Sequence, residues 1–191
     1  MNDKILDLSN LEGKLLLATP QLRGSCFDHS VIYVCVHNEN GAMGLIINNL
    51  MDDLTTSDIL GQVGVHNSQL EYNFPVHFGG PIDNSKGFIL HSDDYSEANT
   101  QHVRNNISLT STLDILEQIT NGGGPSKSII ALGYAGWSAG QLEDEIMQGG
   151  WFGAEADSDI IFETNNLKKW DESVKRLGID INHYSHVAGA A

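Results

Sequence analysis

Residues 30–48, "SVIYVCVHNENGAMGLIIN", constrain the fold more than any other part of this sequence. Two β-prone runs, 30–37 and 42–48, are separated by Asn40-Gly41, a dipeptide typical of tight hairpin turns. Strand geometry puts alternate residues of the first run on two faces: Val31, Tyr33, Cys35 and His37 on one, Ile32, Val34 and Val36 on the other. Both faces are largely apolar, which predicts a central strand covered on both sides.

The remaining hydrophobic pattern predicts further strands and helices. Strands are expected at 14–19, in "PVHFGGP" and "GFILH" on either side of the loop "GGPIDNSK", at 128–134 and at 159–162. Helices are expected at 56–60, within 110–121 with Thr110 or Ser111 as the cap, and from Asn166 to Gly178. Early hairpins followed by strand–helix alternation predict an α+β fold with a hairpin-rich sheet core wrapped by helices.

The length and the absence of repeats predict one domain over residues 1–191, with 1–10 as a loose N-terminal segment. In the last helix, an apolar stripe is expected to face the core: Leu167, Trp170, Val174 and Leu177. Four basic residues are expected on the solvated outer face: Lys168, Lys169, Lys175 and Arg176. Contact of these basic residues with an acidic partner or a phosphate backbone is the alternative.

The charge of the chain disfavours some classes of partner. The 25 acidic and 10 basic residues give a net charge of −15, which repels nucleic-acid phosphates and anionic membranes. The first ten residues lack the apolar core of a signal peptide and no long apolar run occurs, so a cytoplasmic location is expected. In that compartment Cys26 and Cys35 are expected to be thiols rather than a disulfide.

A glycine-rich loop in "GYAGWSAGQLEDEIMQGG", residues 133–150, has two interpretations. Ser138 and Gln141 have capping-box spacing, which predicts a helix beginning at Ser138 whose N-terminus could bind an anion. However, the acidic run 143–145 satisfies the helix dipole and repels phosphate, and neither a Walker loop nor a dinucleotide fingerprint is present. A structural corner is therefore favoured over a phosphate cradle, and a small neutral or cationic ligand remains open.

Three histidines lie at predicted strand ends: His37, His77 and His91. If these ends converge, they form a metal or acid–base site near Cys35. The spacings match no metal motif, so hydrogen-bonded histidines, a buried structural cysteine, and no metal or cofactor are the favoured interpretation. No GxSxG occurs, which argues against an α/β-hydrolase.

Read in order, several blocks resemble the bacterial YqgE/AlgH family: "LLLATPQL", "HNENGAMGLIIN", "HFGGPI", "GFILHS", "LTSTLDIL" and "ALGYAGWSAGQLEDEI". The resemblance spans roughly residues 11 to 190 and implies a single α+β domain. It also implies a transcriptional-regulator label without an agreed activity, ligand or catalytic residue, so no site residue carries over. Two positions depart from the family pattern: 24–26 read "GSC" instead of an Asp-Pro-type turn, and Ala190 stands in place of a histidine.

These features favour a regulatory protein that binds a small effector or a protein partner, without direct DNA readout. The predicted ligand-binding residues lie in and around the loops 79–81 and 133–140: His77, Gly79, Gly80, Pro81, His91, Tyr134, Gly136, Trp137, Gly140 and Gln141. The alternatives are an unrecognised enzyme with His77, His91, Cys35 or Glu143 near one pocket, and nucleic-acid binding through the last helix. No membrane association is expected.

Overall fold

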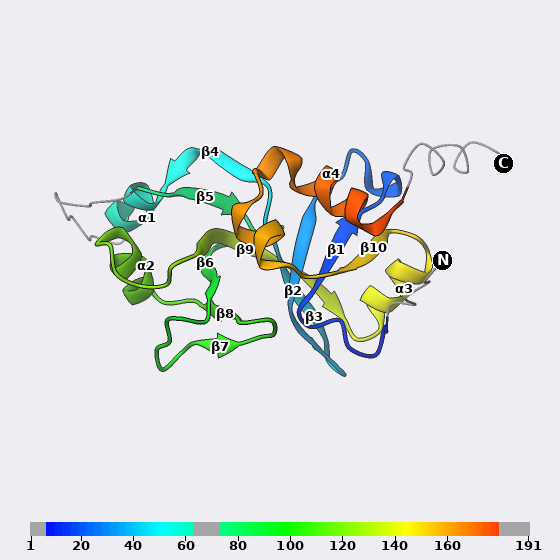
Figure 1. The fold of residues 1–191 in the computed structure, drawn as a ribbon, viewed down its shortest axis with the longest axis horizontal. Coiled ribbons are helices and arrows are strands. Elements are labelled where there is room, and N and C mark those ends of the chain that lie inside the picture. Colours follow the sequence, from blue (N-terminus) through cyan, green and yellow to red (C-terminus); the bar gives the residue numbers. More distant parts are fainter. Residues whose placement is uncertain (1–6, 63–72, 180–191) are drawn as a thin grey trace.

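A ten-stranded sheet forms the framework of the computed structural model, which describes residues 7–62 and 73–179 (Figure 1). The strands are β1 (Lys14–Ala18), β2 (Val31–Asn38), β3 (Gly41–Ile46), β4 (Leu50–Thr55), β5 (Pro75–Phe78), β6 (Ile82–Ser92), β7 (Gln101–His102), β8 (Ile107–Thr110), β9 (Ser128–Ser138) and β10 (Trp151–Glu155). The helices are α1 (Thr56–Gln62), α2 (Leu113–Thr120), α3 (Gln141–Met147) and α4 (Asn166–Leu177), with a 3₁₀ turn η1 (Pro20–Leu22) and a π-helix η2 (Asp159–Glu163). The fold is α+β, as predicted.

The long strand β9 joins the two halves of the sheet. The strand order is β10-β1-β2-β3-β9-β6-β8-β7, and β4 and β5 form a further pair against β9. The first half of β9 pairs antiparallel with β6 and parallel with β5, and its second half pairs antiparallel with β3. In Figure 1, α1 and α2 lie at one end of the sheet and α3 at the other. The predicted hairpin is confirmed as β2–β3.

A β-bulge in β2 changes which face its last residues occupy. The register against β3 shifts between Val34 and Val36, so two residues of β2 oppose one of β3. Cys35 packs in the cluster that contains Tyr33, whereas His37 pairs with Ala42 of the opposite cluster. The prediction that His37 shares a face with Cys35 is therefore wrong, because strict alternation ends at the bulge.

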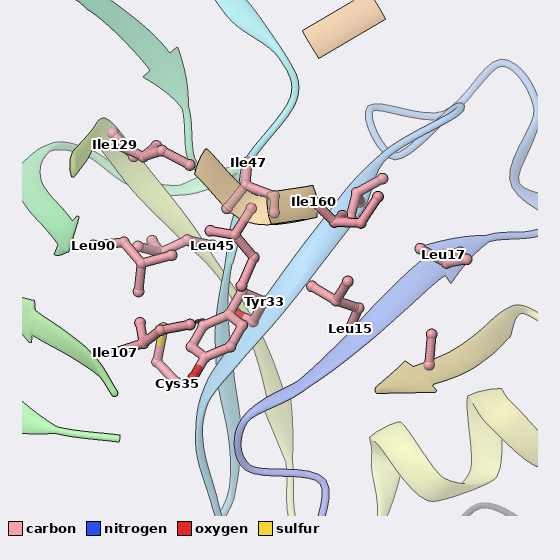
Figure 2. Packing of buried hydrophobic residues seen from close by; sticks show 14 of the residues in the cluster. Leu15, Leu17, Tyr33, Cys35, Leu45, Ile47, Leu90, Ile107, Ile129 and Ile160 are labelled. Atoms are coloured by element: carbon pink, nitrogen blue, oxygen red, sulfur yellow. Dashed lines mark hydrogen bonds between the residues drawn. The ribbon is translucent and has the colours of Figure 1, made fainter. Parts of the chain in front are cut away.

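Three apolar clusters fill the two sides of the sheet. The largest contains residues from β1, β2, β3, β6 and η2 that converge in Figure 2, among them Leu15, Tyr33, Leu45, Leu90 and Ile160. The second cluster covers the other face of the β1–β3 half with Leu142 of α3, and the third packs α1 and α2 on β5, β6 and β9. Neither Cys26 nor Cys35 is in a disulfide.

Several predicted element types are wrong. Residues 159–162 form the π-helix η2 and not a strand, since four apolar residues do not distinguish a strand from a helix turn. The predicted loop after Pro81 is shorter than expected, because β6 already begins at Ile82. Strands β4, β7, β8 and β10 were not predicted: β4 has no buried residue, β7 has two residues, and β8 and β10 are short. Thr112, rather than Thr110 or Ser111, precedes α2.

Helix α4 begins at Asn166 and ends at Gly178 as predicted, but its buried stripe differs from the prediction. The stripe contains Lys169, Trp170, Ser173 and Val174, while Leu167 is 90% exposed at the edge of the first turn. Lys169 is 2% exposed. The expected solvated position of Lys169 is therefore wrong, because a pattern of apolar residues does not reveal a cation that finds buried carbonyl acceptors.

Candidate functional site

The two glycine loops predicted to bind a ligand lie directly against each other. The Gly79 amide donates to the Leu132 carbonyl at 2.8 Å, and the Gly79 carbonyl accepts from the Ile46 amide at 2.9 Å. A Cβ on Gly80 would lie 2.1 Å from the Tyr134 carbonyl carbon, and Gly80 has a φ of 152°. Gly79 and Gly80 are both buried, and the close approach of two backbones explains why glycine occupies these positions. Pro81, the next residue, is exposed.

Helix α3 begins two residues later than the capping-box pattern predicted. Ser138 is the last residue of β9, and Gly140 is the N-cap, with a φ of 76° and no side-chain capping bond. One half of the capping box is present, because the Ser138 amide donates to Gln141 Oε1 at 3.0 Å. Gly136 lies within β9 and not in the turn. The chain thus turns at Gly140, whose conformation is left-handed.

The acidic residues of α3 hold the helix on the sheet. Glu145 Oε2 accepts hydrogen bonds from the indole Nε1 atoms of Trp137 at 2.9 Å and Trp151 at 2.8 Å. Its Oε1 accepts from Gln141 Nε2 at 2.9 Å. The two indole rings meet edge to face, with centroids 6.0 Å apart. Two predicted ligand-binding residues, Trp137 and Gln141, therefore already donate to a carboxylate inside the protein.

His77 and His91 do not converge. Across β9, His77 is opposite Ala131 and His91 is opposite Ser128, an offset of three residues, so the two histidines point to opposite faces of the sheet. His91 lies near the Ser92 carbonyl oxygen at 2.8 Å and Thr110 Oγ1 at 2.9 Å. Burial lowers the pKa of His91. Both histidines are hydrogen-bonded within the protein, and they do not form one acid–base pair.

A buried polar group made of His77, Asn166 and Lys169 lies between β5 and α4. His77 Nδ1 donates to the Ile130 carbonyl at 3.2 Å, which leaves Nε2 to accept from Asn166 Nδ2 at 3.1 Å. The pKa of His77 is lowered to about 4, first by burial and second by the nearby Lys169 ammonium. His77 is thus a neutral imidazole with both nitrogens bonded at neutral pH.

Lys169 carries a buried charge, and its hydrogen-bond acceptors within residues 7–62 and 73–179 are backbone carbonyl oxygens rather than a carboxylate. Its Nζ donates to the carbonyl oxygens of Ile47 at 2.8 Å and Ile161 at 2.7 Å, which tie α4 to β3 and η2. Burial lowers its pKa from 10.5 to about 8. The ammonium is the form that desolvation penalises, so this residue makes stability depend on pH.

Replacement of Lys169 by Met is expected to reveal that dependence in urea unfolding. Between about pH 8 and 10.5 the unfolded chain binds the Lys169 proton and the folded protein does not, so wild-type stability rises with pH relative to Lys169→Met. The difference should grow by about 2–3 kcal/mol across this range. Tyr33 and Cys35, whose pKa values burial raises, titrate equally in both proteins. A difference that stays constant with pH would contradict a desolvated ammonium.

His37 and Cys35 also occupy separate environments. His37 Nδ1 accepts from the Leu11 amide at 3.1 Å, so its Nε2 donates to Glu143 Oε1 at 3.0 Å. Cys35 is fully buried, and burial raises its pKa, so the thiol is the stable form. His77, His91, Cys35 and Glu143 therefore each sit in a different cluster of contacts.

The larger cavity, of about 460 Å³, lies between the α2–β9 loop and η2, away from both predicted glycine loops. Its walls are the rings of Phe74 and Phe162 and the backbone of Gly122 and Gly123. Lys127 and Glu163 also line it and form an ion pair of 2.8 Å. Its volume is within the usual range for small-molecule sites. A second cavity of about 370 Å³ lies between β10 and α4.

Sequence reasoning missed the larger cavity because its walls come from three separate segments. The stretch 121–128, "NGGGPSKS", was interpreted as a helix end followed by a strand. That interpretation is correct locally, since α2 ends at Thr120 and β9 begins at Ser128. The available sequence signal for the cavity was this loop between α2 and β9, which is rich in glycine and serine and contains a lysine.

Two classes of site find no support within residues 7–62 and 73–179. No group of three or more histidine, cysteine, aspartate or glutamate side chains there could hold a metal ion. No helix in that part of the chain is long and apolar enough to cross a membrane. Ala190, noted above as a departure from the family pattern, lies outside the described residues.

Comparison with known proteins places the chain in a family. A family model described as AlgH-like matches residues 15–182. A UPF0301 protein of Jannaschia sp. (strain CCS1) is 42% identical over 184 residues, 95% of this chain and 96% of the relative. A UPF0301 protein of Paracoccus denitrificans (strain Pd 1222) is 40% identical over 186 residues, 96% of this chain and 98% of the relative.

Two solved structures share the fold. The solution structure of the AlgH protein from Pseudomonas aeruginosa is 32% identical, with a TM-score of 0.78 over 97% of this chain and 98% of that chain. A crystal structure of a Corynebacterium diphtheriae protein is 21% identical, with a TM-score of 0.71 over 92% of each chain, and shows the fold alone. The chain therefore belongs to the AlgH-like family.

Proposed function

We propose that this protein is a regulatory protein that acts by binding a small molecule in the cavity between the α2–β9 loop and η2. The observation that carries the proposal is the cavity itself: about 460 Å³, with two phenylalanine rings, a glycine backbone wall and an ion pair. The lining combines apolar side chains with serine, lysine and glutamate, and fixed polar groups of this kind orient a ligand in a binding site. The glycine loops 79–81 and 133–140 do not line this cavity, and their close backbone contact supports the fold elsewhere.

The chemistry of the other candidate residues favours binding over catalysis. A general base needs a free lone pair within reach of a substrate proton. Both ring nitrogens of His77 are bonded and the ring is 5% exposed, and His37 is bonded to a backbone amide and to Glu143. The Cys35 thiol is fully buried. These groups stabilise the fold, which leaves the cavity as the better-supported functional feature.

The positions of the basic residues favour a small ligand over nucleic acid. Lys14, Lys127 and Arg176 are paired with carboxylates of Glu155, Glu163 and Asp157. Lys169, one of the four basic residues of the last helix, is buried. Binding to a phosphate backbone requires several unpaired cations on one surface. These ion pairs leave fewer unpaired cations, and the net charge of −15 already disfavours binding to nucleic acid.

A thermal-shift screen tests the proposal. The panel holds nucleotides, phosphorylated metabolites, amino acids and amines at about 100 times the expected dissociation constant. A bound ligand should then add about 2.7 kcal/mol and raise the melting temperature by roughly 5–10 °C. The shift should be absent in Ser126→Trp, which fills the cavity, and present in Ser111→Trp, an exposed serine outside the lining. A flat panel, or shifts equal in both variants, would contradict the proposal.

A further inference from the structure

We infer that the cavity between the α2–β9 loop and η2 takes an organic cation, an amine or a guanidinium carried by a small molecule. The inference rests on the proposed function and adds the chemical class of the ligand. Two features of the walls lead to it: the loop amides that already have acceptors inside the protein, and the charges distributed around its lysine.

Amide groups that an anion would need are already used inside the protein. Four amides of the loop have internal acceptors: Gly122 to the Ile119 carbonyl, Gly123 to the Gln118 carbonyl, Ser126 to the Asp94 carboxylate, and Lys127 to Ser92 Oγ. Anion sites built from glycine-rich loops depend on amides that point at the ligand. These four amides are therefore already bonded within the protein and are not available to an anion.

The charged side chains around the cavity are predominantly acidic. Lys127 is the cation of the lining, and Glu163 pairs with it at 2.8 Å. Asp94 accepts from Ser126 of the lining at 3.1 Å, and Asp159 also acts electrostatically on Lys127. Two carboxylates, Glu163 and Asp159, act on this one ammonium, and Asp94 lies at Ser126, so an additional anion would meet a net negative field. An added cation would share Glu163 with Lys127.

The size and walls of the cavity point to an organic cation and not to a metal ion. A metal ion needs several ligand atoms at about 2–2.5 Å around one point, and no such group exists among residues 7–62 and 73–179. A volume of about 460 Å³ fits a molecule of many atoms. Phe162 lines the cavity, and an aromatic ring attracts a cation through its face.

Three isosteric probes of different charge test this inference: benzamidine (cationic), benzamide (neutral) and benzoate (anionic). Their binding is followed by amide chemical shifts of the loop residues in ¹⁵N-labelled protein. Benzamidine should bind roughly two- to fivefold more tightly than benzamide, as expected for one cation–aromatic contact, and benzoate most weakly. Glu163→Gln should weaken benzamidine binding and Lys127→Met should strengthen it. Lys168→Met, which removes an exposed lysine outside the lining, should leave it unchanged.

The outcomes separate the two proposals. If benzoate binds best and Lys127→Met abolishes its binding, the inference of a cation is overturned while a ligand site in the cavity stands. If none of the three probes shifts the loop amides at millimolar concentration, the inference is also overturned. The proposed function fails only if the metabolite screen gives no shift that Ser126→Trp removes.

Discussion

Gly80→Ala is expected to lower the free energy of unfolding by about 4 kcal/mol, from a strained backbone conformation and from steric overlap with backbone atoms. The φ of 152° at Gly80 is one that L-residues rarely adopt. The added Cβ would lie 2.1 Å from the Tyr134 carbonyl carbon and 2.4 Å from the Ala135 nitrogen. Backbone atoms of a central strand cannot move aside as a flexible side chain can. Urea unfolding measures the effect.

Gly140→Ala is the matched control for this prediction. Gly140 also has a positive φ, 76°, but a Cβ there would meet no atom within 4 Å. The control should therefore lose only about 1–2 kcal/mol, the cost of a left-handed conformation. Equal losses in the two variants would show that the contact of Gly80 with β9 is not the reason why position 80 is glycine. A clearly larger loss in Gly80→Ala than in Gly140→Ala would explain the "GGP" motif by packing, without a ligand.

The fold was predictable where local patterns decide it. The β2–β3 hairpin follows from Asn40-Gly41 between two apolar runs, and α4 ends at Gly178 because glycine adopts the left-handed conformation there. Prediction failed where tertiary contacts decide. The buried Lys169 donates to the Ile47 carbonyl, far away in the sequence, and neither the bulge at Cys35 nor the π-helix at 159–163 has a local sequence pattern that predicts it.

The candidate site was less predictable than the fold. Their glycine content led to the prediction that loops 79–81 and 133–140 bind a ligand. Close contact between two backbones explains the glycines at 79, 80 and 133 instead. The cavity takes its walls from around Phe74, from the α2–β9 loop and from η2, and no pattern within one segment reports that these meet. A site assembled from separate segments becomes visible only in the folded chain.

Glu145→Ala is expected to lower the free energy of unfolding by about 4 kcal/mol, because two buried indole donors would lose their acceptor at about 1–3 kcal/mol each. Trp137 and Trp151 are 7% and 3% exposed, and both donate to Glu145 Oε2. Gln141 loses its partner as well. Removal of the half-buried carboxylate opens the indole nitrogens to water, so tryptophan fluorescence should shift to longer wavelength in the folded variant, and urea unfolding gives the energy.

Two further variants decide what the carboxylate does. Asp144→Ala, exposed on the same helix, should change the stability by no more than about 0.5 kcal/mol and leave the fluorescence unchanged, because no tryptophan donates to it. Glu145→Gln keeps an oxygen acceptor but loses the charge, so it should lie between wild type and Glu145→Ala. If Glu145→Ala unfolds like Asp144→Ala, the indole bonds contribute nothing measurable. In that case the acidic run 143–145 would need a different explanation from anchoring α3 to the sheet.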